Sequence, residues 1–409
     1  MQRFSLILLL SLIIAFTWYP AAEAHTLKQS EFRAVWISSV TNIDWPSSPY
    51  LSSEEQKAEF IDILEESKKM GLNAVIVQIR PTADAFYPSQ LNPWSKYLTG
   101  EQGKSPGYDP LAFMIEEAHA RNLEFHAWFN PYRVSMDTQL NHLVPDHPAR
   151  ENPDWVVSYG GKLWYDPGIP AVQEHIVESI MEVVRNYDID AVHFDDYFYP
   201  YPVQGEEFPD EETYQTYGQN FPDKGDWRRH NVNTLVQNTS QAIKSEKPGV
   251  KFGISPFGIW KNKSSDPTGS DTNGSESYFT VYADSRTWIQ EGWLDYIAPQ
   301  IYWNIGHPAA DYSKLLDWWS EEVTSKNIHL YIGHAAYKIG NDNDAWNNPE
   351  EIPNQIKLSR QNEHAKGGIF FSYKDLKANR LGIKDRLTND LYREPAEIPP
   401  MPWLDNESK

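Results

Sequence analysis

The chain has 409 residues, a formal net charge of −21 and no cysteine. Its acidity argues against a nucleic-acid partner, whose phosphates it would repel, and the missing cysteine excludes disulfide bonds. The 16 tryptophans and 23 tyrosines suit a core and, where they cluster in expected loops, also suit sugar rings, which have an apolar face and a hydroxyl rim.

The first 24 residues have the pattern of a secretory signal peptide. Arg3 precedes the apolar run "SLILLLSLIIAF", and Ala-Glu-Ala at 22–24 forms a cleavage site. We therefore expect a mature chain that begins near His25 and is secreted or associated with the cell envelope. An uncleaved membrane anchor is the alternative, disfavoured because the apolar run is short. No later run is long and apolar enough to span a membrane, so no membrane contact is expected after cleavage.

Eight short runs rich in β-branched and aromatic residues follow, and helical patterns separate them. Ser53 with Gln56 three residues later predicts a capping box, and Gly71 predicts the end of that helix. Asp109 before Pro110 predicts the start of the next helix. The expected strands are 32–38, 73–80, 123–130, 190–196, 250–257, 295–303, 328–337 and 367–373.

Strand and helix alternate eight times, which predicts an α/β fold with a single (β/α)8 TIM barrel. Links out of the helices are short. Links out of the strands are long at about 131–168, 198–226 and 258–278, where Pro, Gly, Asn and Trp indicate irregular loops. Such loops at the C-terminal face of the strands build the active sites of these barrels. The expected organisation is a signal peptide 1–24, a barrel 25–390 and a Pro-rich C-terminal tail 391–409.

Alternation along the strands predicts which side chains point into the barrel. The outer set must be apolar because it meets the helices, and this rule phases five of the strands. Polar groups then fall inside, near the C-terminal ends, where a purely structural barrel would carry Val, Ile or Leu. A satisfied polar plug is the structural alternative. The inward residues near these ends are Gln78, Arg80, His126, Trp128, Asn130, His193, Asp195, Ser255, Gln300 and Tyr302.

The stretch "AVHFDDYFYP" ends the fourth expected strand with two adjacent carboxylates. Asp195 should point towards the barrel axis, with His193 one inward step below it and Tyr197 one step above. Asp196 should lie at the turn into the loop, at the rim or facing a neighbouring strand. Repulsion and partial burial raise the pKa of at least one of the two carboxyls, as a proton donor requires at neutral pH. A loop cap or an ion pair with an arginine is the inert alternative for Asp196.

Five stretches together resemble the glycoside-hydrolase-like family 10 proteins, which are exported bacterial barrels. They are "EFRAVWISSVTNIDWP", "GLNAVIVQIRPTADAFYPS", "FHAWFNPYR", "AVHFDDYFYP" and "LDYIAPQIYW". The resemblance covers the chain from residue 31 to about 390 and implies an exported glycoside hydrolase. It also implies a polysaccharide partner, most directly peptidoglycan strands stripped of their peptides, a β-1,4-linked polymer of GlcNAc and MurNAc. We expect no cofactor and no metal, and make no prediction of the oligomeric state.

Glycoside hydrolysis needs a carboxylic acid, together with a carboxylate nucleophile or a base that activates water. Alternatively, a 2-acetamido group of the substrate attacks its own anomeric carbon, as in chitinase-type barrels. We expect Asp195 to lead the acid chemistry, Asp196 to orient it or to hold the acetamido group, and Tyr302 to complete the catalytic set. Candidates for a second carboxylate from another loop are Asp44, Asp84, Glu206 and Glu276.

A wider set of polar and aromatic residues is expected to bind the glycan. Arg80 and Arg133 are assigned to the lactyl carboxylate of MurNAc, and Trp45 and Trp303 to stacking on sugar rings. The complete set of expected substrate-binding residues is Trp45, Arg80, Asp84, Asn130, Tyr132, Arg133, His193, Tyr197, Gln300 and Trp303.

Two other function classes stay open. A non-catalytic glycan-binding barrel would keep the groove without turnover. A metal-dependent hydrolase would use His126, His193 and Asp195, but the first strand offers only Ser38 and Ser39 in place of the paired histidines that such barrels usually carry.

Overall fold

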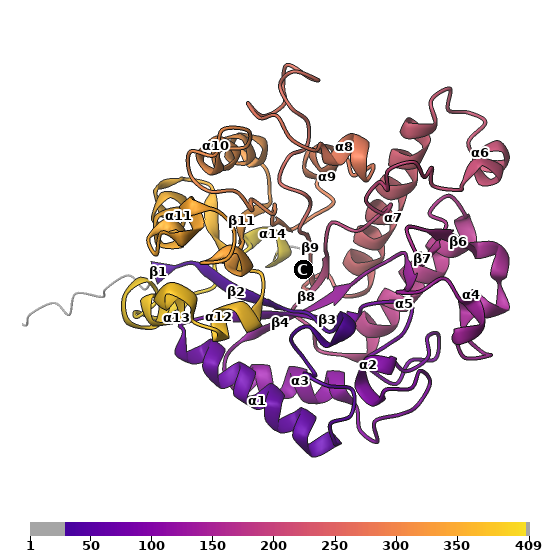
Figure 1. Cartoon of the computed structure of the whole chain (residues 1–409), viewed down its shortest axis with the longest axis horizontal. Coiled ribbons are helices and arrows are strands. Elements are labelled where there is room, and N and C mark those ends of the chain that lie inside the picture. Colours follow the sequence, from indigo (N-terminus) through magenta and orange to yellow (C-terminus); the bar gives the residue numbers. More distant parts are fainter. Residues whose placement is uncertain (1–28, 406–409) are drawn as a thin grey trace, which may run out of the picture.

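The computed structural model describes residues 29–405, so the expected signal peptide lies outside the described residues. Eight parallel strands close into a barrel in the order β10-β11-β12-β2-β3-β4-β8-β9, with helices around it (Figure 1). The predicted TIM barrel is confirmed, and each strand overlaps one of the expected runs. The strands are β2 (Phe32–Ile37), β3 (Ala74–Arg80), β4 (Glu124–Phe129), β8 (Ala191–Phe194), β9 (Lys251–Ile254), β10 (Tyr296–Ile297), β11 (His329–His334) and β12 (Ala365–Phe370).

A helix follows each barrel strand and covers its outer face. The sequence predicted the starts of two of these helices, and only one of the two predictions is confirmed. Ser52 and Glu55 form the capping box of the first helix, so the predicted pair Ser53 and Gln56 is wrong by one residue, whereas Asp109 caps α3 as predicted. The helices that follow the strands are α1 (Ser53–Lys69), α3 (Pro110–His119), α5 (Pro170–Asn186), α7 (Lys224–Glu246), α9 (Ser285–Gln290), α10 (Tyr312–Val323), α11 (Glu351–Gln361) and α13 (Ile383–Arg386).

The long loop after β4 is not irregular as expected. It contains a three-stranded antiparallel sheet of β5 (Arg133–Ser135), β7 (Lys162–Tyr165) and β6 (Val156–Tyr159). Gly160 and Gly161 join β6 to β7, and both have a positive φ, 56° and 72°. A two-residue turn with both φ positive suits a β-hairpin, and the Gly-Gly pair was the sequence signal for it.

The predicted inward and outward phases are borne out except at Arg80, where a β-bulge breaks the alternation. Outward residues such as Val192, Phe194 and Phe252 belong to the large core between barrel and helices. Inward apolar residues form a separate cluster inside the barrel, which Met401 and Leu404 of the C-terminal segment join near the N-terminal ends of the strands. The barrel is therefore closed at that end. Within residues 29–405, no helix is long and apolar enough to cross a membrane.

Candidate active site

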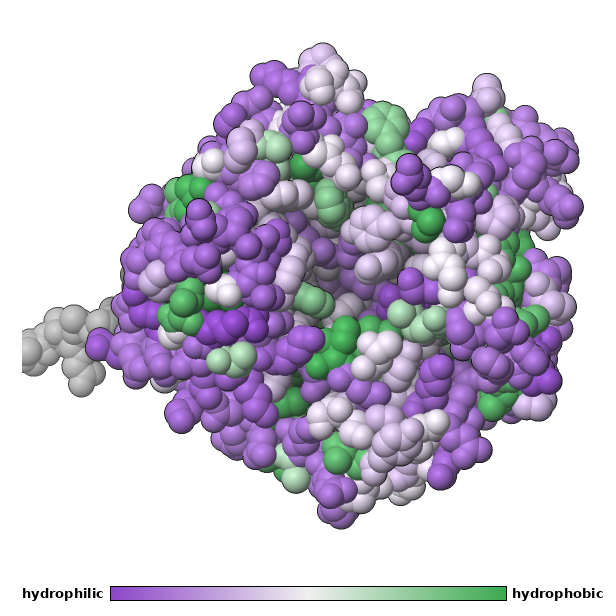
Figure 2. Space-filling model, viewed as in Figure 1, coloured by the Kyte–Doolittle hydropathy of each residue, from purple (hydrophilic) through white to green (hydrophobic). Residues whose placement is uncertain are grey.

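A cavity of about 480 Å³ lies at the C-terminal ends of the barrel strands, and Figure 2 shows this hollow in the middle of the molecule. Its volume is in the range of small-molecule sites. Charged and amide groups share the lining with aromatic rings, a composition that suits a sugar. The lining residues are Trp36, Ser38, Val40, Thr41, Ile43, Gln78, Trp128, Arg133, Met136, Asp195, Asp196, Tyr197, Tyr201, Ser255, Phe257, Gln300, Tyr302, Tyr337 and Phe371.

Asp195 directly follows β8 and is held from the side of β3 and β4. Its Oδ2 accepts hydrogen bonds from Trp128 Nε1 at 3.2 Å and Asn130 Nδ2 at 2.5 Å. Its Oδ1 accepts from the backbone N–H of Tyr197 at 2.9 Å. Asn130 is itself aimed by Gln78, whose Nε2 donates to Asn130 Oδ1 at 2.5 Å. Because these groups are buried, they fix the direction of the carboxylate.

Asp196 is held from the opposite side of the cavity. Gln300 Nε2 donates to Asp196 Oδ1 at 2.8 Å and to the carbonyl of Ser255 at 3.0 Å. The hydroxyl of Tyr201 donates to Asp196 Oδ2. The two neighbouring carboxylates therefore belong to separate hydrogen-bond networks.

Burial, together with repulsion from Asp196, raises the pKa of Asp195 to about 7. Burial also raises the pKa of Asp196, although hydrogen bonds from Tyr201 and Gln300 act in the opposite direction. The positive charge of Arg133 lowers the pKa of both carboxyls without offsetting burial. The pair therefore retains a proton close to neutral pH, as the sequence predicted, and this is the state that acid catalysis requires.

Six of the predicted site residues meet in this cavity. Tyr302 lines it close to the two carboxylates, and within residues 29–405 its hydroxyl has no hydrogen-bond partner. Trp303 lies just outside the lining, with its ring edge-on to Phe257 at 5.7 Å. The catalytic and binding roles of all these residues stay predictions. The six that line the cavity are Arg133, Asp195, Asp196, Tyr197, Gln300 and Tyr302.

Two predicted sugar contacts lie behind the cavity wall. Asn130 is fully buried and contacts Asp195 in place of a ligand. His193 is also fully buried, one layer below Asp195, where Trp36 Nε1 donates to its Nε2 at 3.1 Å. The expectation of direct sugar contact is wrong for both, and each is better described as a support of residues that line the cavity.

The sequence assigned Arg80 and Trp45 to substrate binding. This assignment is wrong, because neither side chain lines the cavity. A β-bulge between Gln78 and Arg80 breaks the alternation, and the guanidinium donates to the carbonyls of Asn130 and Pro131. Trp45 is fully buried in the core outside the barrel, edge-on to Phe60.

Tyr132 and the four candidates for a second carboxylate also lie away from the cavity. Tyr132 is fully buried. Asp84 is buried beside Thr82 and does not line the cavity, so both of its proposed roles, in substrate binding and as the second carboxylate, are wrong.

The other three candidate carboxylates are engaged elsewhere in the fold. Asp44 joins the ends of β2 and β12 by accepting hydrogen bonds from Ser38, Ser372 and Lys374. Glu206 accepts a hydrogen bond from Gly160, and Glu276 accepts one from Asn262. In the described part of the chain, Asp195 and Asp196 are thus the only carboxylates that line the cavity.

The residues of the metal-dependent alternative do not form a donor set. Because Trp36 donates to His193 Nε2, His193 Nδ1 carries the proton and donates to the hydroxyl of Tyr296 at 2.9 Å. That hydroxyl is then left to donate to His126 Nδ1, also at 2.9 Å, and His126 Nε2 faces Glu124. The ring nitrogens are therefore engaged by the protein, and residues 29–405 contain no group of three or more acidic or histidine side chains that could hold a metal.

Several aromatic residues of the cavity were missed by the sequence reasoning. Trp36 lies on the first barrel strand, which was not phased, and its inward position follows the same alternation rule. Tyr201, Tyr337 and Phe371 follow the ends of their strands, where alternation no longer applies. The cluster "DYFYPYP" was the only sequence signal for Tyr201.

Comparison with known proteins identifies the family. The model of the family "Glycosyl hydrolase-like 10" matches residues 31–348. The chain is 62% identical over 387 residues to glycosyl hydrolase YngK of Bacillus subtilis, covering 94% of this chain and 76% of that protein. It is 45% identical over 333 residues to glycosyl hydrolase DigH of Escherichia coli K12, covering 77% of this chain and 76% of that protein.

Two solved structures share the fold. One is α-L-fucosidase isoenzyme 2 of Paenibacillus thiaminolyticus, with a TM-score of 0.53, 15% identity, and coverage of 89% of this chain and 49% of that chain. The other is the PgaB (BpsB) glycoside hydrolase domain of Bordetella bronchiseptica, with a TM-score of 0.53, 13% identity, and coverage of 88% and 98%. The chain therefore belongs to the glycosyl hydrolase-like 10 family, in agreement with the resemblance and with the enzyme class, glycoside hydrolase, that the sequence predicted.

Proposed function

We propose that this protein is an exported glycoside hydrolase that cleaves β-1,4-linked amino-sugar glycan, with peptide-free peptidoglycan strands as its substrate. Its site of action would be the cell envelope or the exterior, as the expected signal peptide of residues 1–24 suggests. The observation that carries the proposal is the pair of buried carboxylates, Asp195 and Asp196, which retains a proton near neutral pH in an aromatic-lined cavity.

In this mechanism Asp195 gives its proton to the glycosidic oxygen while the bond from that oxygen to the anomeric carbon breaks. The departing sugar leaves as an alcohol. In one route the acetamido oxygen of the substrate closes on the anomeric carbon, and a water molecule then opens the new ring and returns a proton to Asp195. In the other route a water molecule attacks the anomeric carbon directly and gives a proton to Asp196. In both routes the charged Asp196 orients the attacking group. The proposal needs no further carboxylate in the cavity, which agrees with the lining described above.

Two further groups support a charged amino-sugar glycan as substrate. The Tyr302 hydroxyl, which has no protein partner within residues 29–405, can donate to a sugar oxygen. Arg133 donates through Nε to the carbonyl of Pro81 at 2.9 Å, and in the described structure its terminal nitrogens make no hydrogen bond. A guanidinium placed in this way suits the carboxylate of a MurNAc lactyl group.

The test is the release of reducing ends from purified peptide-free glycan strands. Asp195→Asn and Asp196→Asn should each keep the fold and lose about 10²- to 10⁴-fold in rate. Asp84→Asn makes the same change in a buried carboxyl outside the cavity and should retain the wild-type rate. Full activity in both cavity variants would refute the mechanism. A wild-type protein that retains the polymer without shortening it would instead be a glycan-binding barrel.

A further inference from the structure

Tyr201 is in direct contact with one of the paired carboxylates. Its hydroxyl donates to Asp196 Oδ2, and its ring lines the cavity. The ring is also confined, because it lies edge-on to Tyr197 at 5.3 Å and to Phe257 at 6.3 Å. The hydroxyl therefore has a fixed direction, towards Asp196.

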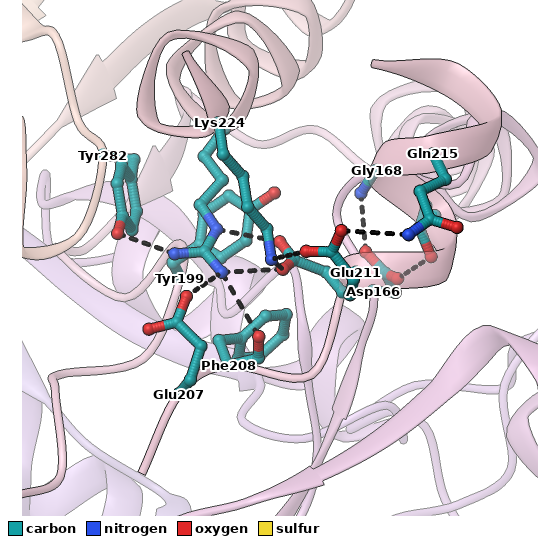
Figure 3. A network of polar contacts seen from close by, with 12 residues as sticks. Asp166, Gly168, Tyr199, Glu207, Phe208, Glu211, Gln215, Lys224 and Tyr282 are labelled. Atoms are coloured by element: carbon teal, nitrogen blue, oxygen red, sulfur yellow. Dashed lines mark hydrogen bonds and ion pairs between the residues drawn. The ribbon is translucent and has the colours of Figure 1, made fainter. Parts of the chain in front are cut away.

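The loop that carries Tyr201 is anchored on its far side by a buried ion cluster. Arg228 of α7 donates to both carboxylate oxygens of Asp210, at 2.8 and 2.6 Å, and to the hydroxyl of Tyr282 at 2.7 Å. Lys224 contacts the same carboxylate at 2.8 Å, and Figure 3 shows Lys224 and Tyr282 beside this cluster. Since Asp210 is fully buried, breaking the cluster would leave a buried charge without its partner, which strongly destabilises the fold. The loop is thus held against the barrel.

The two carboxylates differ in what surrounds each oxygen. Both oxygens of Asp196 accept a hydrogen bond from a side chain, one from Tyr201 and one from Gln300. In Asp195, Oδ2 accepts two side-chain hydrogen bonds, and Oδ1 accepts only the backbone N–H of Tyr197. Asp195 Oδ1 and both oxygens of Asp196 therefore each keep a free lone pair, and what distinguishes Asp196 is the phenol donor on its Oδ2.

Two buried carboxyls that repel each other share one proton over a range of pH. A hydrogen bond from a phenol stabilises an ionised oxygen more than a neutral one. We propose that Tyr201 is a positioning residue that keeps the negative charge of the pair on Asp196 and the proton on Asp195. This inference rests on the proposed function, in which Asp195 is the acid, and adds the residue that sets its protonation.

Tyr201→Phe tests the inference, because it removes one oxygen atom and keeps the ring. In protein labelled with 13C at the aspartate carboxyls, the lower titration step of the pair should rise by about one pH unit, since Asp196 loses a donor to its ionised form. The signals are assigned by their absence from D195N and D196N. On glycan strands kcat should fall about tenfold with little change in KM, and the acidic limb of the pH profile should move upward by the same amount.

Two further variants separate this role from a structural one. Tyr199→Phe removes a hydroxyl from the same loop, one that accepts from Asn231 at 3.2 Å and does not line the cavity, and should leave the titration and kcat unchanged. 3-Fluorotyrosine at position 201 keeps the ring, is a stronger donor, and should lower the same titration step. If Tyr201→Phe does not fold, the 3-fluorotyrosine variant still tests the inference.

An unchanged titration step in the Tyr201 variants would overturn the inference. A wild type that titrates as described but does not cleave the glycan would refute the proposed function and leave the protonation role of Tyr201 standing.

Discussion

The two ends of the barrel interior use the same inward alternation for opposite purposes. Towards the closed end, a directed chain runs from Trp36, which lines the cavity, through His193, Tyr296 and His126 to Glu124, and each donor in it has an acceptor. At the cavity end, two carboxyls are held in a setting that disfavours their charge, and hydroxyl groups face the open space. The closed end thus stabilises the fold, and the cavity end gives up stability for chemistry.

The first way to test this contrast is the pH dependence of stability. The pKa of Asp195 is raised from 3.8 to about 7, so between these values the native state binds more protons than the unfolded state. The free energy of unfolding should therefore fall as pH rises from about 4 to 7, by about 4 kcal/mol from this group.

Urea unfolding of the wild type and of Asp195→Asn across this pH range measures the difference. The variant should show a clearly shallower decline, because it has lost the titrating group. Parallel curves would mean that Asp195 is not destabilised by its surroundings.

At the closed end, Tyr296→Phe should lower stability without touching the chemistry. The variant leaves two buried ring nitrogens, His193 Nδ1 and His126 Nδ1, without their partner. A buried polar group without a partner costs about 1–3 kcal/mol, so a loss of about 3 kcal/mol is expected in chemical unfolding. The rate per folded molecule on glycan strands should match the wild type. A variant as stable as the wild type would show that the chain of hydrogen bonds does not stabilise this end.

At the cavity end, Asn130→Ala should lower the catalytic rate as well as the stability. It removes the 2.5 Å donor to Asp195 and leaves Gln78 without an acceptor for its amide. The carboxylate then loses its fixed direction, and kcat should fall about 10- to 100-fold, which corresponds to about 1.4–2.7 kcal/mol. Steady-state kinetics measure the loss, and unfolding of the same variant provides the control. An unchanged kcat would show that Trp128 and Tyr197 are sufficient to hold Asp195.

The sequence predicted most of this contrast, because alternation is a property of the backbone. Asp195, Gln300 and Tyr302 were placed correctly by counting residues along the expected strands, although all three lie just past the ends of β8 and β10 in the structure. Arg80 was misplaced because a β-bulge cannot be seen in a period of two. Trp45 was misplaced because an aromatic ring in a loop can face the core as easily as solvent. Tyr201 was missed because it lies past the strand end, where its position depends on the whole loop.

The smallest expected effect concerns Tyr132, for which the sequence predicted substrate contact. The residue is fully buried, and its hydroxyl has no hydrogen-bond partner in the described structure. Tyr132→Phe removes an unsatisfied polar group and should leave stability unchanged or raise it by up to about 1 kcal/mol, in contrast to Tyr296→Phe. Thermal unfolding and the rate on glycan strands, expected at the wild-type level, measure the two consequences. A destabilised variant would show that the hydroxyl is satisfied by a buried water, and a slower one would return Tyr132 to the substrate-binding set.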